Sequence, residues 1–198
     1  MTISKICAGL TLVLQLAIAG HVAAQTSSAP PVQDVSTALL TWVKHLNNDV
    51  EKYYKPEKGA DLSQHLGGLK DDLQVYMKTR KKLSDSLFRN NIKPGKKDPD
   101  QLEDLKTKMS AVMGHMRDVS DLVSNDLRKE GDKLNEEMYE ALYGQQPRYL
   151  SFLEAFLDGV EVTKKDLAVD GSVHYQRLEE CIGVIASLKD KIDRKTKK

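Results

Sequence analysis

Apolar residues recur every three or four positions along most of this chain, which is the spacing that places side chains on one face of an α-helix. The first stripe consists of Val35, Leu39, Trp42, Leu46, Val50 and Tyr53. Pro56 and Gly59 then end the helical pattern. The second stripe alternates steps of four and three and consists of Leu62, Leu66, Leu69, Leu73, Tyr76, Arg80, Leu83 and Leu87. Two amphipathic helices are therefore predicted before residue 90.

The start of the second helix contains two adjacent glycines, Gly67 and Gly68. Each glycine costs about 1 kcal/mol of helix propensity relative to alanine. We therefore expect the stable part of this helix to begin near Leu69.

Three further stripes follow the turn-forming residues 90–95. Asp98, Pro99 and Gln101 supply a capping side chain, a first-turn proline and a residue three positions after the cap, which predicts a helix start at this point. The third stripe changes phase near Gly131, which indicates a bend or a break. The three stripes consist of Leu102, Leu105, Met109, Val112, Met116, Val119 and Val123, continued by Leu127, Leu134, Met138 and Leu142; of Leu150, Leu153, Leu157 and Val160; and of Leu178, Cys181, Ile185, Leu188 and Ile192.

The predicted fold class is all-α, an antiparallel bundle of four to five amphipathic helices, because such stripes can be buried only against one another. In the compact form, which we favour, the chain reverses at residues 56–59 and again at residues 170–172. The alternative is an elongated three-armed rod of residues 33–90, 99–143 and 147–197, in which those two positions are only kinks. No segment after residue 24 has the roughly 18 uninterrupted apolar residues of a membrane-spanning helix.

The N-terminus has the pattern of a signal peptide over residues 1–24. Lys5 precedes a short apolar core, and the small residues Val22 and Ala24 fit cleavage before Gln25. Residues 25–34 contain two adjacent prolines and form a predicted flexible lead-in, and residues 35–198 form a single helical domain with a basic tail. We expect an exported protein, periplasmic or extracellular.

Removal of residues 1–24 leaves 174 residues with 29 basic and 29 acidic side chains and a single cysteine, Cys181. One thiol cannot form an internal disulfide, so the hydrophobic core must supply the stability. Cys181 lies on a stripe, and we expect it to be buried and unreactive.

Motifs for catalysis and cofactor binding are absent from the sequence. It has no Cys-x-x-Cys-His for covalent haem, no Glu-x-x-His for a di-iron centre and no nucleophile motif. Met109, Met113, His115 and Met116 could bind copper, and a His–Met pair could bind haem, but methionine is also a common core residue. We expect no enzymatic activity, no cofactor and no metal, and we expect the histidines at the edges of their stripes.

Charge is distributed unevenly along the chain. Residues 78–97 have a net charge of +7, and residues 118–140 have a net charge of −5. Because the second and third helices fold back near residue 94, the basic residues form the tip of a hairpin, far from the acidic block. The predicted binding residues are Lys78, Arg80, Lys81, Lys82, Arg89, Lys93, Lys96 and Lys97. Among them, Arg80 replaces a leucine on its stripe, and its neighbours predict that its long side chain reaches solvent.

These features favour an interaction or adaptor protein that binds an anionic partner through the basic tip. The partner is an acidic protein, an anionic glycan or a membrane surface rather than nucleic acid, because few aromatic residues lie among the basic ones. The alternative is a carrier of lipid or another apolar ligand between the helices. Leucine-rich stripes favour the interaction protein over the carrier, because a filled core leaves no space for a bound ligand.

Overall fold

The computed structural model describes residues 35–53, 56–93, 95–127, 129–143, 152–157 and 159–197, and these residues are helical apart from short turns. The α-helices are α1 (Ser36–Tyr53), α2 (Gly59–Arg89), α3 (Asp98–Leu127), α4 (Lys129–Tyr143), α5 (Phe152–Leu157), α6 (Lys164–Val169) and α7 (Tyr175–Thr196). A 3₁₀ turn (Pro56–Lys58) precedes α2, and a π-helical turn (Asp170–His174) joins α6 to α7.

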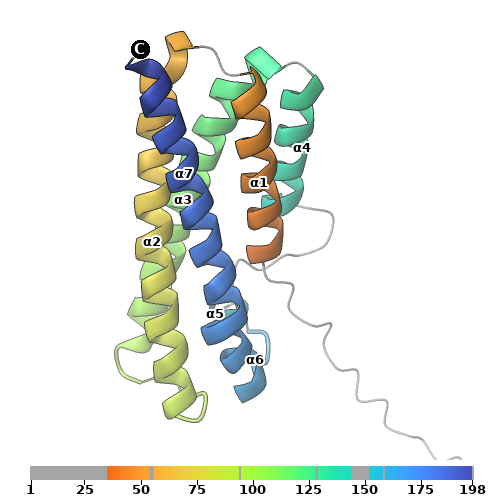
Figure 1. The fold of residues 1–198 in the computed structure, drawn as a ribbon. Coiled ribbons are helices and arrows are strands. Elements are labelled where there is room, and N and C mark those ends of the chain that lie inside the picture. Colours follow the sequence, from red (N-terminus) through yellow and green to blue (C-terminus); the bar gives the residue numbers. More distant parts are fainter. Residues whose placement is uncertain are drawn as a thin grey trace, which may run out of the picture.

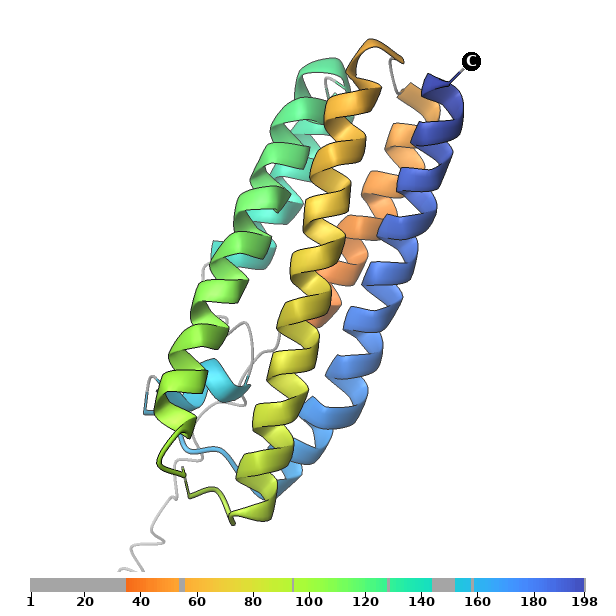
Figure 2. The ribbon, with the colours of Figure 1, turned by 90° about the vertical axis from the view of Figure 1, so that its left-hand side faces the viewer.

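Five helices, α1, α2, α3, α4 and α7, pack side by side (Figure 1). The chain runs up through α1, down α2, up α3 and down α4, and α7 returns upward beside both α2 and α1 (Figure 2). Most neighbours are therefore antiparallel, whereas α1 runs in the same direction as α7 and as α3, which it contacts less extensively. The predicted all-α helical bundle is confirmed.

One of the two expected chain reversals is present. The chain reverses at the turn between α1 and α2, which excludes the three-armed rod. The reversal expected at residues 170–172 is wrong, because α6 continues through the π-helical turn directly into α7. A capping box begins α6. The Thr163 side chain accepts a hydrogen bond from the Asp166 N–H, and the Asp166 side chain accepts one from the Thr163 N–H.

The phase change in the third stripe corresponds to a full reversal between α3 and α4. The helix α3 ends at Leu127, directly after the sequence Ser124, Asn125 and Asp126, and α4 begins at Lys129. These three residue types are weak helix formers, which explains why the helix ends there rather than at Gly131. Gly131 instead lies buried in the first turn of α4.

The predicted stripes form one hydrophobic core. Every stripe residue whose side chain is described in α1, α2, α3, α4 and α7 is buried, and Trp42, Leu66, Met116 and Ile185 are fully removed from solvent. Burial of one leucine side chain stabilises a fold by roughly 1.5–3 kcal/mol. Leu62 and Leu66 are both buried before the glycines, and together they exceed the helix-propensity cost of about 2 kcal/mol for Gly67 and Gly68. The helix α2 therefore begins at Gly59, and the expected start near Leu69 is wrong.

The bundle has unequal ends. α2 and α3 contain 31 and 30 residues, whereas α1 and α4 contain 18 and 15 and stop well short of the turn between α2 and α3. At that end α2 and α3 are accompanied by α5, α6 and the start of α7. Among the described helices none is long and apolar enough to cross a membrane. The predicted signal peptide, the lead-in and residues 144–151 lie outside the described residues.

Candidate functional site

The predicted basic residues lie at the end of the bundle where α2 turns into α3. Lys78, Lys82 and Arg89 are exposed on the last turns of α2, and Lys81 is half-buried beside them. The turn itself carries Lys93, Lys96 and Lys97, and all three are exposed. The hairpin arrangement expected from the sequence therefore brings seven of the eight predicted residues to one end of the molecule.

Arg80 is the exception, and its predicted exposure is wrong. Its side chain is 2% exposed and forms an ion pair with Asp170, whose side chain is fully buried. The Nε atom of Arg80 donates to Oδ1 of Asp170 over 2.7 Å, and the guanidinium carbon lies 6.0 Å from the centre of the Tyr76 ring. The π-helical turn carries Asp170 to this position. Arg80 therefore does not belong to the basic surface.

A hollow of about 250 Å³ lies between the end of α2 and the start of α7. Its lining residues are Lys78, Lys81, Lys82, Asp85, Arg89 and Tyr175. We call this surface the basic hollow. Four cations thus face a single carboxylate, that of Asp85. Lys81 bridges the two helices, because its Nζ lies 3.1 Å from Asp85 Oδ2 and 5.8 Å from the centre of the Tyr175 ring.

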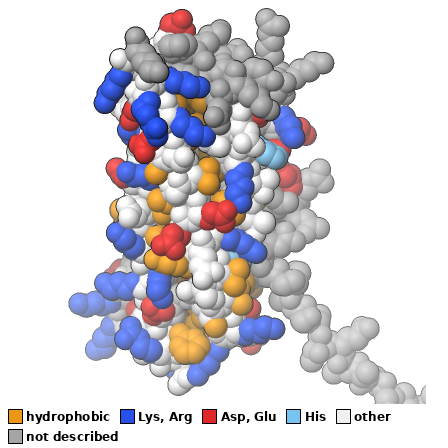
Figure 3. Space-filling model, viewed as in Figure 1, with side chains coloured by type: hydrophobic (Ala, Val, Ile, Leu, Met, Phe, Trp, Pro, Cys, Tyr) orange, Lys and Arg blue, Asp and Glu red, His pale blue; other side chains and the backbone are white. Residues whose placement is uncertain are grey.

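Two further cations and an exposed aromatic ring lie at the same end. Lys164 and Lys165 are exposed at the start of α6, and Lys164 Nζ lies 5.7 Å from the centre of the Phe88 ring. Phe88 is 45% exposed. The space-filling view shows hydrophobic side chains among Lys and Arg at this lower end (Figure 3). Lys164 and Lys165 are about 70 residues away from the predicted basic residues along the chain, so the sequence alone gives no reason to group them together.

The positive charge occupies one side of this end rather than all of it. The first turns of α3 carry exposed carboxylates at Asp100, Glu103 and Asp104, and Lys108 pairs with Asp104 over 2.5 Å. Asp98 is buried and accepts a hydrogen bond from the Gly95 N–H, so it closes the turn. The basic surface is therefore the side formed by α2, α6 and the start of α7.

The other charged segments lie at the opposite end of the bundle. The acidic block occupies the second half of α3 and α4, where Asp118, Asp132, Glu136 and Glu140 are exposed. The C-terminus of α7, with its basic residues, also lies there, away from the basic hollow. This is the separation of basic tip and acidic block expected from the sequence.

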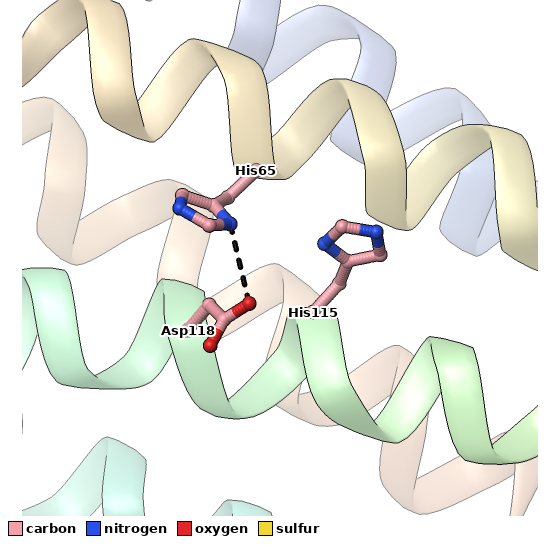
Figure 4. A group of neighbouring side chains, drawn as sticks. All are labelled: His65, His115 and Asp118. Atoms are coloured by element: carbon pink, nitrogen blue, oxygen red, sulfur yellow. Dashed lines mark ion pairs between the residues drawn. The ribbon is translucent and has the colours of Figure 1, made fainter.

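A second group of polar residues lies between α2 and α3, toward the acidic end. His65, His115 and Asp118 each offer a nitrogen or oxygen atom within 4.8 Å of the others, and Figure 4 shows the two rings and the carboxylate facing one another. His65 Nδ1 lies 3.3 Å from Asp118 Oδ2, and the two ring centroids are 6.0 Å apart. His115 Nε2 lies 3.3 Å from Asp72 Oδ2. Within the part of the chain that the structure describes, His65, His115 and Asp118 form the group that could hold a metal ion.

Gly68 explains how the His115 ring fits against α2. A Cβ atom at position 68 would lie only 2.4 Å from Cε1 and 2.5 Å from Nε2 of His115. The ring therefore occupies the volume that any other side chain at this position would fill. Of the methionines considered as copper ligands, Met109 and Met116 are buried in the core, and Met113 is partly buried against it.

His45, His174 and Cys181 lie outside this group, and each is held by contacts within the bundle. His45 Nδ1 lies 2.6 Å from Glu137 Oε2 between α1 and α4. His174 is buried rather than at an edge, and its Nδ1 lies 3.0 Å from Ser36 Oγ. Cys181 is fully buried, as predicted, and this burial raises the pKa of its thiol to about 12.

An apolar hollow of about 390 Å³ bears on the carrier alternative. It is lined by Ile92, Phe156, Gly159, Val160, Glu161 and Val162, so it lies between the turn after α2 and the segment after α5. It does not lie between the core helices, where a carried lipid was expected.

No family model matches the chain, and comparisons with curated proteins and with solved structures give no match. Its function is therefore argued from the arrangement of its own side chains.

Proposed function

We propose that this protein is an exported, non-enzymatic interaction protein that binds an anionic partner through the basic hollow. The observation that carries the proposal is the hollow itself, in which Lys78, Lys82 and Arg89 are exposed around the half-buried Lys81. Like charges repel one another, and an anionic group would offset this repulsion. Export is supported by the sequence of residues 1–24 alone.

An acidic segment of another protein is the partner that the geometry favours. The cations of the hollow are gathered around the half-buried Lys81, so one projecting carboxylate can contact several of them at once. Phe88 and Val173, 45% and 41% exposed, add apolar surface on the neighbouring elements. Aromatic and arginine side chains are enriched in protein–protein interfaces.

The proposal can be tested by reversing charge at the hollow. The double variant Lys78→Glu/Lys82→Glu changes two exposed cations, and it leaves Lys81, which contacts Asp85 and Tyr175, in place. The probe is a fluorescent peptide of alternating Glu and Ala residues. We expect salt-dependent binding of the wild type and a loss of affinity of about tenfold in the variant.

The matched control is Lys133→Glu/Lys197→Glu, which makes the same charge change at the opposite end, on two exposed side chains. It should bind the peptide nearly as well as the wild type. Equal binding by all three proteins would show that the hollow is only a solvated surface. Binding to vesicles of anionic lipid or to heparin, with none to the peptide, would instead identify a membrane or a glycan as the partner.

A further inference from the structure

We propose that His65, His115 and Asp118 bind a divalent transition-metal ion between α2 and α3, with Asp72 orienting His115. The site lies toward the acidic end of the bundle, away from the basic hollow, and it does not depend on the proposed anionic partner. It joins one ligand from α2 to two ligands from α3 (Figure 4).

The first support comes from two ring nitrogens that lack hydrogen bonds. Nδ1 of His65 and Nδ1 of His115 are both buried from solvent, and neither has a hydrogen-bond partner in the structure. Asp118 Oδ2 is 3.3 Å from His65 Nδ1, but the two atoms are not aligned as a hydrogen bond. Buried polar atoms without partners are rare in proteins, and a metal ion would satisfy both nitrogens at once.

The second support is the spacing of the ligand atoms. Nitrogen and oxygen ligands at about 2.0–2.1 Å from a tetrahedral zinc ion are about 3.3 Å from one another. The distance between His65 Nδ1 and Asp118 Oδ2 already has this value, and all three ligand atoms lie within 4.8 Å. The three side chains are 30–51% exposed, so small rotations can close the remaining gap.

The third support is Asp72, which contacts the other ring nitrogen of His115. Its Oδ2 lies 3.3 Å from Nε2, so its carboxylate favours the tautomer in which Nε2 carries the proton. The lone pair of Nδ1 is then directed toward His65 and Asp118. A carboxylate behind a metal-binding histidine is a common arrangement that fixes the ring and raises its basicity.

Gly68 completes the site by leaving space for the His115 ring. The nearest ring atom would be 2.4 Å from a Cβ atom at position 68, so any larger residue would displace the ring. Gly68 lowers the helix propensity of α2, but it leaves the space in which the His115 ring can act as a ligand.

The ligand types indicate the kind of metal. Imidazole with carboxylate suits zinc and other divalent first-row ions, whereas copper(I) prefers the thioethers that are buried in the core here. Three protein ligands leave a fourth position for water.

The test uses the purified protein after dialysis against a chelator, titrated calorimetrically with Zn²⁺. We expect one ion per chain and a loss of affinity of at least about 100-fold in His65→Ala, His115→Ala and Asp118→Ala, because ligand removal exceeds the 10–100-fold effect of losing an outer partner. Asp72→Asn should weaken binding by about 10–100-fold. His45→Ala, which removes a histidine between α1 and α4, is the control and should bind normally.

A pair of glycine variants tests the position of His115 without removing a ligand. Gly68→Ala should weaken Zn²⁺ binding strongly. Gly67→Ala is the matched control, because its Cβ would meet only the flexible end of Lys189 at 3.4 Å. Circular dichroism of each variant reports whether the helices still form.

Nitrogen-15 NMR of the wild type gives a readout independent of the variants. We expect Zn²⁺ to shift Nδ1 of His65 and His115 and not the nitrogens of His45. Zn²⁺ at about one hundred times its Kd should also raise the Tm by about 5–10 °C. Absence of one-to-one binding at micromolar Zn²⁺, shifts at Nε2 instead of Nδ1, or unchanged binding by His115→Ala would each overturn the proposal.

Discussion

Arg80 and Asp170 form an ion pair that is almost completely removed from water, with side chains 2% and 0% exposed. The two residues are 90 positions apart, and their contact joins α2 to the turn between α6 and α7. Ser84 supports the same contact by donating to the Leu167 carbonyl over 3.0 Å. The pair therefore fixes how the C-terminal part of the chain lies against α2.

Removal of one partner should be strongly destabilising. We expect Arg80→Leu to lower the free energy of unfolding by about 3–5 kcal/mol, because the Asp170 carboxylate would be left buried without its guanidinium. Denaturant unfolding measures this loss. The double variant Arg80→Leu/Asp170→Leu should recover much of it, and a double variant that loses as much as the two single variants together would contradict the pairing.

Burial should make the Cys181 thiol unreactive. Its pKa is raised to about 12, mainly by burial and secondarily by the charge of Glu180. Since the thiolate is the reactive form, we expect a thiol reagent at pH 8 to modify Cys181 only after denaturant is added. A monomer band in non-reducing electrophoresis is the second expected result, and rapid labelling of the folded protein would refute burial.

The same pKa shift predicts a loss of stability in alkali. The folded-state pKa lies above the unfolded value of 9.0, so the stabilisation is complete below pH 9 and is lost as pH rises toward 12. A shift of three units corresponds to about 4 kcal/mol at most. Cys181→Ala, compared with the wild type between pH 8 and 11, should have a shallower decline. Parallel curves would show that Cys181 does not titrate in this way.

Asp193 should contribute to stability above its own pKa. A hydrogen bond from Lys189, followed by one from Ser63, lowers the pKa of its carboxyl group. A carboxyl with a lowered folded-state pKa stabilises the protein above its unfolded pKa, and this contribution disappears as pH falls through the folded value. Asp193→Asn should therefore lose less stability than the wild type on acidification, and Ser63→Ala should be intermediate.

The two glycines of α2 should respond differently to alanine. Gly67→Ala should stabilise the protein by about 1 kcal/mol, because it adds helix propensity where the new methyl group meets only Lys189. Gly68→Ala should gain less or lose stability, because the His115 ring must move. Thermal unfolding of both variants measures the difference, and equal gains would show that the ring moves freely.

Periodicity predicted the buried face of each long helix because burial follows from spacing alone. It could not predict the partner of Arg80, since that depends on how α6 and α7 lie against α2, which no local pattern specifies. The expectation that Arg80 reaches solvent, drawn from the neighbouring Lys78, Lys81 and Lys82, was wrong for this reason. These lysines are on the outer side of the helix, whereas Arg80 faces inward.

The histidine cluster left a signal that the sequence analysis did not use. In an antiparallel hairpin, residues equally distant from the turn lie opposite each other. His65 lies opposite Asp118, and three residues further along α2 Gly68 lies opposite His115, three residues earlier on α3. Symmetric pairing across residues 90–97 places His65 opposite residue 122, about one helical turn from Asp118, so it would have brought these residues into the same region without setting the exact register. Their side-chain orientation still required the structure.

The shortness of α1 and α4 makes the bundle unequal along its length. Near the basic hollow, α2 and α3 are covered by the short helices α5 and α6 instead of two long neighbours. Segments with fewer packed neighbours open at lower free energy, so backbone amides at this end should exchange with deuterium sooner than those near Trp42 and Leu66. A partner that orders this end would slow that exchange there and leave the opposite end unchanged.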